Sequence, residues 1–199
     1  MKPCVVVSRQ MGSEGNAVAL ATAKLVGYRY VIGATIKKAA FRHGVGGTEW
    51  RWLDQAWDRL FVTPGERPNI RLDVLRPVLV EMCAGWQGTL FVGRGVEEIL
   101  RGCALILHAH VVAPFEVRVA RIQRQVNIMH SRAEERVHRS DEENFWFYRT
   151  FFGIDWNDVT RPHIVIDTAA VALPEAATML ADLLKAVSLG GVKSCSGLG

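Results

Sequence analysis

The sequence predicts an α/β fold in which helices cover a parallel β-sheet. Short apolar runs rich in β-branched residues recur along the chain, and such runs are typical of buried parallel strands. Stretches with a helical pattern separate these runs, and this alternation indicates a parallel rather than an antiparallel sheet. The chain has 199 residues, of which 49% are hydrophobic and 22% charged, so we expect one domain with a sizeable core.

The first apolar run, CVVVS, contains no charged residue and predicts a strand at the centre of the sheet. The polar loop that follows it is then expected at the carboxyl edge of the sheet, where parallel α/β folds bind their ligands. The predicted strands are residues 4–8, 28–32, 89–95, 104–114 and 163–168.

Helical patterns fill the intervals between these strands. The first helix is expected from about Asn16 to Val26, with Gly27 as its stop. Residues 114–153 predict two helices in succession. A helix is also expected at 69–86, in which Pro77 would favour a bend. Further helices are expected at 35–43 and 173–187, a Trp-rich amphipathic stretch at 49–61, and loops at 43–48 and 63–68.

Composition restricts the class of protein. No apolar run reaches the roughly 20 residues that cross a bilayer, and the N-terminus lacks a signal-peptide pattern, so we expect a cytoplasmic protein without a membrane partner. The four cysteines form no C-x-x-C pair, so no metal site is expected from them. His108 and His110 share one strand face, but without a third ligand nearby we interpret them as core or rim residues. The net charge of +4 permits a polyanionic partner without requiring one.

The segment from residue 5 to residue 25 runs from an apolar strand through a glycine-containing loop into an Ala-rich helix. Gly12 and Gly15 allow a sharp turn and a close approach of the backbone to a ligand, and Ser13 offers a hydroxyl. The phosphate-loop pattern G-x-x-x-x-G-K-[ST] nevertheless fails at three of its fixed positions, including Asn16 in place of lysine. Two interpretations remain open: a phosphate site, or a plain turn with Asn16 as the N-cap.

Arginines concentrate in the two helices predicted for residues 114–153. The first helix has Arg118 and Arg121, with Arg124 near the same side, and the second has Arg132, Arg136 and Arg139 on one face. One interpretation is a solvated helix face paired with neighbouring glutamates. The other is a set of cations for phosphoryl transfer, which depends on positioning and charge neutralisation.

The order of these parts resembles the cytidylate kinase-like branch of the P-loop nucleoside monophosphate kinases. The resemblance spans about residues 4–187 and implies a three-layer P-loop NTPase-type fold, with a five-stranded parallel sheet and a helical lid at about 118–153. It also implies ATP, Mg²⁺ and transfer of phosphate to a pyrimidine monophosphate. The motifs are SRQMGSEGNAVA, GYRY, FVGRGVEEIL, VAPFEVRVARIQR, RSDEENFWFYRTFFGIDWND and HIVIDT.

Carried over by position, the resemblance assigns three groups of site residues. Arg94 and Arg149 would bind the acceptor. The loop would hold the ATP phosphates, and the lid would supply catalytic charge together with Arg9. The loop residues are Ser8, Arg9, Gly12, Ser13, Gly15 and Asn16, and the lid residues are Arg118, Arg121, Arg139 and Asp141.

Several positions depart from the pattern of the family. In the loop, Asn16 replaces a basic residue and Glu14 replaces a glycine, and after the first helix Val31 replaces an aspartate. The lid pattern D-K-x-R becomes D-E-E-N at residues 141–144, which removes basic charge. The leading hypothesis is an ATP-dependent phosphotransferase that acts on a nucleoside monophosphate or a similar small anionic acceptor. A nucleotide-binding protein without turnover is the alternative, and a basic nucleic-acid-binding protein ranks last because no binding motif is present.

The predicted organisation is a single domain over residues 1–188, which acts as a monomer or homodimer, followed by a Gly/Ser-rich tail, 189–199, that we expect to be disordered.

Overall fold

The computed structural model describes residues 2–44, 75–84, 87–103 and 106–189. Within these residues five strands form one sheet in the order β2-β3-β1-β4-β5, and every neighbouring pair is parallel. The strands are β1 (Cys4–Arg9), β2 (Arg29–Ile32), β3 (Thr89–Val92), β4 (Ile106–Val112) and β5 (Ile164–Asp167). The prediction of a parallel sheet with the first strand at its centre is therefore confirmed.

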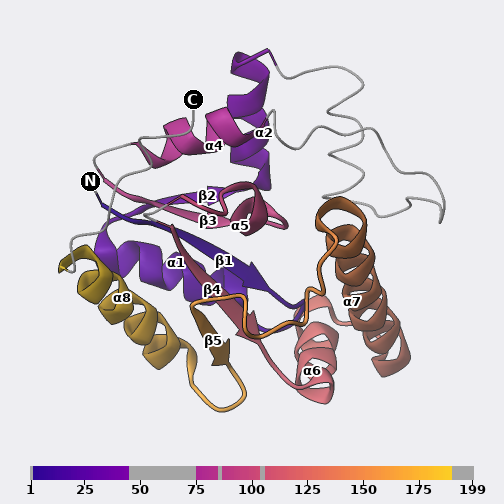
Figure 1. Cartoon of the computed structure of the whole chain (residues 1–199). Coiled ribbons are helices and arrows are strands. Elements are labelled where there is room, and N and C mark those ends of the chain that lie inside the picture. The colour runs from indigo at the N-terminus through magenta and orange to yellow at the C-terminus, as the bar shows by residue number, and fades with distance from the viewer. Residues whose placement is uncertain (1, 45–74, 85–86, 104–105, 190–199) are drawn as a thin grey trace.

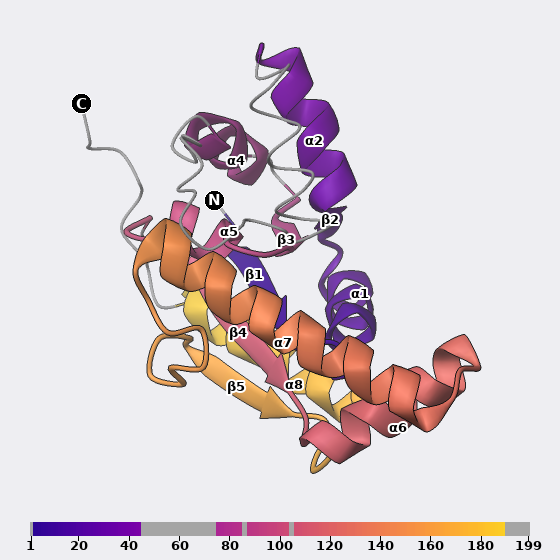
Figure 2. The same cartoon turned by 90° about the vertical axis from the view of Figure 1, so that its right-hand side faces the viewer.

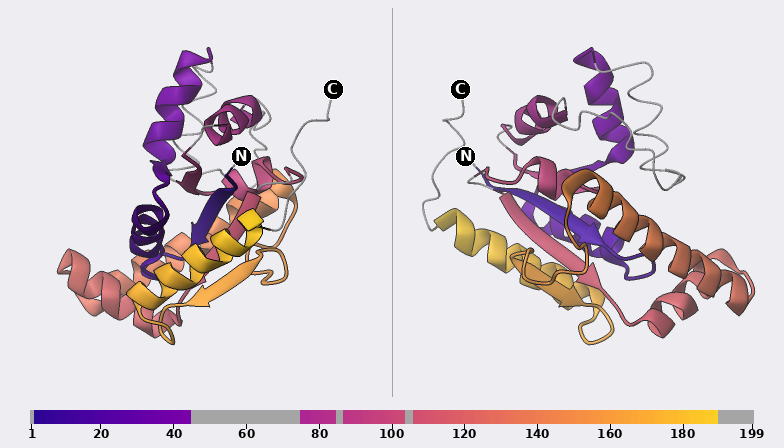
Figure 3. Two further views of the ribbon diagram at one scale, coloured as in Figure 1. Left: turned by 90° about the vertical axis from the view of Figure 1, so that its left-hand side faces the viewer. Right: turned by 45° about the vertical axis from the view of Figure 1, so that its right-hand side comes forward.

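Helices cover both faces of the sheet. Because side chains alternate along a strand, Val5 and Val7 face one core cluster while Cys4 and Val6 face the other. Figures 1 and 3 show α1 and α8 on one face, with α2, α4 and α5 on the other. The helices are α1 (Gly15–Val26), α2 (Gly33–Arg42), α4 (Leu75–Cys83), α5 (Val96–Ile99), α6 (Phe115–Val126), α7 (His130–Phe152) and α8 (Leu173–Leu189).

Helices α6 and α7 form an antiparallel pair beside the carboxyl ends of the strands. They pack through a separate apolar cluster that includes Val119 and Ile122 from α6 and Ala133 and Val137 from α7. Figure 2 shows α7 passing in front of the tips of β1 and β4. The pair therefore lies over the edge of the sheet at which a ligand is expected.

Two details differ from the expectations. Helix α1 begins at Gly15 and Glu14 occupies the N-cap in a left-handed conformation, so the interpretation of Asn16 as N-cap is wrong. The short helix α5 was not predicted, because four residues carry too little periodicity to be recognised. The expectations for residues 45–74 and for the tail 190–199 lie outside the described residues. None of the described helices combines the length and apolar character needed to cross a membrane.

Candidate functional site

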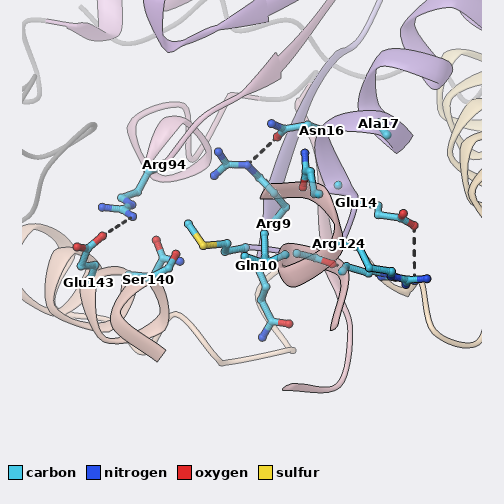
Figure 4. A pocket seen from close by; sticks show the side chains of 16 residues that line it. Arg9, Gln10, Glu14, Asn16, Ala17, Arg94, Arg124, Ser140 and Glu143 are labelled. Carbon is cyan, nitrogen blue, oxygen red and sulfur yellow. Dashed lines mark hydrogen bonds and ion pairs between the residues drawn. The ribbon is translucent and has the colours of Figure 1, made fainter. Parts of the chain in front are cut away.

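A cavity of about 850 Å³ lies between the β1–α1 loop, the turn after β3 and the α6–α7 pair. This volume falls within the range of about 300–1,000 Å³ that small-molecule sites occupy. Figure 4 shows Arg94, Ser140 and Glu143 at one end of the cavity, Glu14 and Arg124 at the other, and Arg9 between them. The charged lining residues are Arg9, Arg94, Arg121, Arg124, Glu14 and Glu143.

Arg9 lies beside Asn16, the residue that stands at the lysine position of the phosphate-loop pattern. Its Nε donates a hydrogen bond to Asn16 Oδ1 at 2.9 Å, which fixes the guanidinium beside the start of α1. The side chain crosses directly over Gly15, where a Cβ would lie 2.4 Å from Arg9 Cβ. Gly15 is therefore required by the path of Arg9, and burial lowers the pKa of this arginine from its ordinary value.

The rest of the loop contacts α6. Glu14 has φ 62° and ψ 12°, a left-handed conformation that favours glycine, and its carboxylate lies 3.5 Å from Arg121 Nη2. Arg121 also donates to the hydroxyl and the carbonyl oxygen of Thr168, both at 2.8 Å. Gly12 has φ 79°, and a Cβ there would lie 2.7 Å from the carbonyl oxygen of Arg118. The loop and the beginning of α6 thus pack as one unit.

Arg118 and Asp141 join α6 to α7. The buried guanidinium donates two hydrogen bonds to the carboxylate, at 3.0 and 2.8 Å, and a third to the carbonyl oxygen of Ala113 at 3.0 Å. Neither Arg118 nor Asp141 is among the described residues that line the cavity. Their catalytic assignment stays a prediction. In the structure their hydrogen bonds connect α7 to α6.

Removal of the carboxylate should therefore destabilise the fold. We expect Asp141→Ala to lower the free energy of unfolding by about 2 kcal/mol, because it leaves the buried Arg118 without its main partner. Asp182→Ala, which breaks an exposed pair with Lys185, should cost less than about 1 kcal/mol. Urea unfolding monitored by circular dichroism measures both values, and equal losses would contradict this role of the Arg118–Asp141 pair.

Ser8 and Ser13 are predicted to bind phosphate, and in the structure both hydroxyls contact other groups of the protein. Ser8 Oγ lies 2.7 Å from both His108 Nε2 and His110 Nδ1, on the side away from the cavity. Ser13 Oγ donates to the carbonyl oxygen of Gln10 at 2.8 Å. Burial lowers the pKa of His108 to about 3 and that of His110 to about 4, so both imidazoles are neutral at pH 7. No cluster of three metal-ligating side chains occurs among the described residues.

Three arginines of α7, Arg132, Arg139 and Arg149, face solvent. Arg132 and Arg139 both pair with Glu135, at 2.9 and 2.7 Å, which agrees with the interpretation of a solvated helix face. Arg149 is also exposed, and within the described residues the cavity lining includes none of these three side chains. The predicted roles of Arg139 in catalysis and of Arg149 in acceptor binding stay predictions.

Arg94 does reach the cavity, as expected. Its guanidinium lies over the Phe147 ring, 5.5 Å from the centroid, and Nη2 is 4.0 Å from Glu143 Oε2. The hydroxyl of the buried Tyr148 binds Glu97 Oε1 and accepts a hydrogen bond from the Gly95 amide at 3.0 Å. This contact anchors α7 beside the turn that carries Arg94. Burial raises the pKa of Glu97 to about 7.

Arg124 was named only among the candidate cations of residues 114–153, and Ser140, Glu143 and Asn144 were not assigned to the site. All four line the cavity. A signal was present, because Arg124 follows Arg121 by three positions, and Ser140, Glu143 and Asn144 share a helix face at spacings of three and four.

Comparisons with known proteins agree with this architecture. The family model described as "Cytidylate kinase-like family" matches residues 4–170. No curated protein matches the chain. Among solved structures, an uncharacterized protein from Eubacterium ventriosum is similar at a TM-score of 0.67 and 15% identity, covering 92% of this chain and 99% of that one.

Two solved kinases are also similar. A shikimate kinase from Acinetobacter baumannii has a TM-score of 0.52 at 16% identity, over 95% of this chain and 96% of its own. A gluconokinase from Sinorhizobium meliloti has a TM-score of 0.54 at 16% identity, over 94% and 96%. At these identities the likeness concerns the fold, which is that of the P-loop kinases. The family model matches most of the chain, residues 4–170, and the chain therefore belongs to the cytidylate kinase-like family.

Proposed function

We propose that the protein is an ATP-dependent phosphotransferase that moves phosphate to a nucleoside monophosphate or a similar small anionic acceptor. Membership of a kinase-like family supports this class of reaction. The observation that carries the proposal is the convergence of Arg9, Arg94, Arg121 and Arg124 on one cavity at the start of α1. Phosphoryl transfer requires mainly positioning and charge neutralisation, which fixed arginines supply.

The loop end of the cavity suits the phosphates of ATP. The dipole of α1 favours an anion at this end, where the helix begins at Gly15 and the amide of Ala17 donates to the carbonyl oxygen of Glu14 at 2.9 Å. Arg9 supplies a fixed cation there, and Arg121 and Arg124 from α6 line the same region. Mg²⁺ usually keeps several waters and binds through substrate phosphates, where it neutralises their charge. Because Ala17 offers no hydroxyl, the phosphates of ATP would hold Mg²⁺ at this site.

Arg94 suits the acceptor. It lies across the cavity from the loop and is held against Phe147, so its guanidinium can bind a carboxylate or phosphate group. An acceptor oxygen placed between Arg94 and Arg9 would attack the γ-phosphorus, and the bond between the γ-phosphorus and ADP would break. Arg9 is well placed to neutralise charge on the phosphoryl group in transit.

A nucleotide-binding protein without turnover is the competing function. It is favoured by one observation: Arg139 and Arg149 of the lid lie outside the cavity, so the lid contributes fewer cations than the resemblance implies. Titration calorimetry with ATP, with and without Mg²⁺, combined with an assay of ADP release over a panel of acceptors, separates the two. Binding with acceptor-dependent ADP release supports the phosphotransferase, and binding without release supports the alternative. Absence of ATP binding would overturn both.

Arg94→Ala should raise the KM for the acceptor by about 10- to 100-fold and leave the Kd for ATP unchanged. The physical reason is the loss of a charge-assisted contact, worth about 1.5–3 kcal/mol, at the acceptor end alone. Arg132→Ala, which removes the same charge from an exposed position of α7, is the matched control. Steady-state kinetics and calorimetry check both values. A weaker ATP affinity with an unchanged acceptor KM would show that the roles of the two ends are exchanged.

A further inference from the structure

The acceptor end of the cavity carries a carboxylate as well as an arginine. Glu143 extends from α7 toward Arg94, and the two charged groups face each other across 4.0 Å. This separation is longer than a hydrogen bond, so they do not close into a hydrogen-bonded pair. Both side chains are partly withdrawn from solvent, Arg94 at 12% exposure and Glu143 at 26%.

The charges differ between the two ends of the cavity. At the loop end Arg121 and Arg124 outnumber Glu14, and Arg9 lies between the two ends, an arrangement that suits a polyphosphate. Among the described residues at the other end, Arg94 faces Glu143, so a dianionic phosphate bound there would be attracted by one group and repelled by the other. A molecule with one negative charge and a hydrogen-bond donor matches this end better, because the anion faces Arg94 and the donor faces Glu143.

Polar side chains continue this pattern along α7. Ser140 and Asn144 lie one turn before and one residue after Glu143, and both line the cavity while being almost fully buried. They offer additional hydrogen-bonding groups of both kinds, as a polyhydroxylated ligand requires. Among the described residues, the acceptor end thus combines one arginine and one carboxylate with two uncharged polar side chains.

The chemistry of the acceptor distinguishes the possibilities further. An attacking phosphate oxygen is already anionic, whereas an attacking hydroxyl must lose a proton, and a carboxylate can serve as the base. The carboxylates among the described lining residues are Glu14 and Glu143. Glu14 is paired with Arg121 at the loop end, which leaves Glu143 as the carboxylate at the acceptor end. Burial raises the pKa of Glu143 above its ordinary value, which makes its carboxylate a stronger base.

We propose that Arg94 and Glu143 together select a hydroxy acid with one negative charge as the phosphoryl acceptor, and that Glu143 is the general base. The acceptor hydroxyl oxygen bonds to the γ-phosphorus of ATP as the bond from that phosphorus to the β-phosphate oxygen breaks. ADP leaves, the hydroxyl proton passes to the Glu143 carboxylate, and the product is a phosphate monoester of the acid. This inference rests on the proposed phosphotransferase function and narrows its acceptor.

The test compares Glu143→Gln with Glu142→Gln. Glu142 is the adjacent glutamate of α7, lies on another face beside His138, and loses the same charge when replaced. Wild type should phosphorylate glycerate, quinate or glucuronate with a kcat/KM at least about tenfold above that for CMP, UMP or AMP. Glu143→Gln should lower kcat with the hydroxy acid by about 10²- to 10⁴-fold, the usual contribution of a general base. ATP affinity should stay constant, and Glu142→Gln should match wild type.

Glu143→Asp keeps a carboxylate and should retain part of the activity. This variant keeps the test valid if Glu143→Gln fails to fold. Preference of the wild type for nucleoside monophosphates, or an unchanged kcat in Glu143→Gln, would overturn the inference and leave the phosphotransferase proposal intact. Absence of ATP binding in calorimetry would overturn both.

Discussion

Replacing Arg9 by methionine is expected to weaken ATP binding by about 100-fold while the fold remains stable. Arg9 is the cation at the mouth of the loop, held by Asn16 at 2.9 Å, and a charge-assisted bond to phosphate contributes about 1.5–3 kcal/mol. Methionine keeps the aliphatic stem that packs over Gly15, so the backbone of the loop should be preserved. Calorimetric titration with ATP measures the loss, and Arg132→Met, at an exposed position, is the matched control.

A second substitution tests whether Arg9 replaces the missing lysine. In the Arg9→Met background, Asn16→Lys should recover at least about tenfold of the lost affinity, because it restores a cation at the start of α1. In the wild-type background the same substitution should give little gain, since it removes the acceptor that holds Arg9 and places two cations together. If Asn16→Lys changes the ATP affinity equally in both backgrounds, Arg9 does not take the place of the missing lysine.

The sequence predicted what depends on local patterns. The CVVVS run lies at the centre of the sheet because a strand buried on both faces requires continuous apolar residues. The end of α1 at Gly27 was recognisable because this glycine takes the left-handed conformation at the C-cap. The start of the helix was misjudged by one residue, since nothing in the sequence indicates that Glu14 accepts a positive φ.

The tertiary contacts of the site could not be predicted in this way. The register of β1 against β4 places Ser8 opposite His110, and registers between distant strands are not encoded locally, so the contact of Ser8 with the two histidines could not be foreseen. The proximity of Arg94 and Glu143 depends on how α7 crosses the end of β3, which follows from packing around Phe147 and Tyr148. Arginine spacing likewise could not show that Arg118 binds Asp141.

Gly12→Ala should produce the largest loss of stability of the substitutions considered, about 3 kcal/mol in the free energy of unfolding. Gly12 has φ 79°, and a left-handed conformation costs a non-glycine residue about 1–2 kcal/mol. The added Cβ would also lie 2.7 Å from the carbonyl oxygen and 2.9 Å from the Cβ of Arg118. Overpacking of this kind typically costs a further 1–3 kcal/mol, roughly, because a backbone segment must move.

Gly27→Ala separates the two contributions. Gly27 has a similar φ of 66°, but nothing lies within 4 Å of the position of its Cβ, so only the conformational cost of about 1 kcal/mol should appear. Urea unfolding of both variants gives the difference in the free energy of unfolding. Equal losses would show that Arg118 moves away from the added Cβ without a measurable loss of stability. Because that contact joins the loop to α6, Gly12→Ala should also weaken ATP binding, whereas Gly27→Ala, at the far end of α1, should leave the Kd for ATP unchanged.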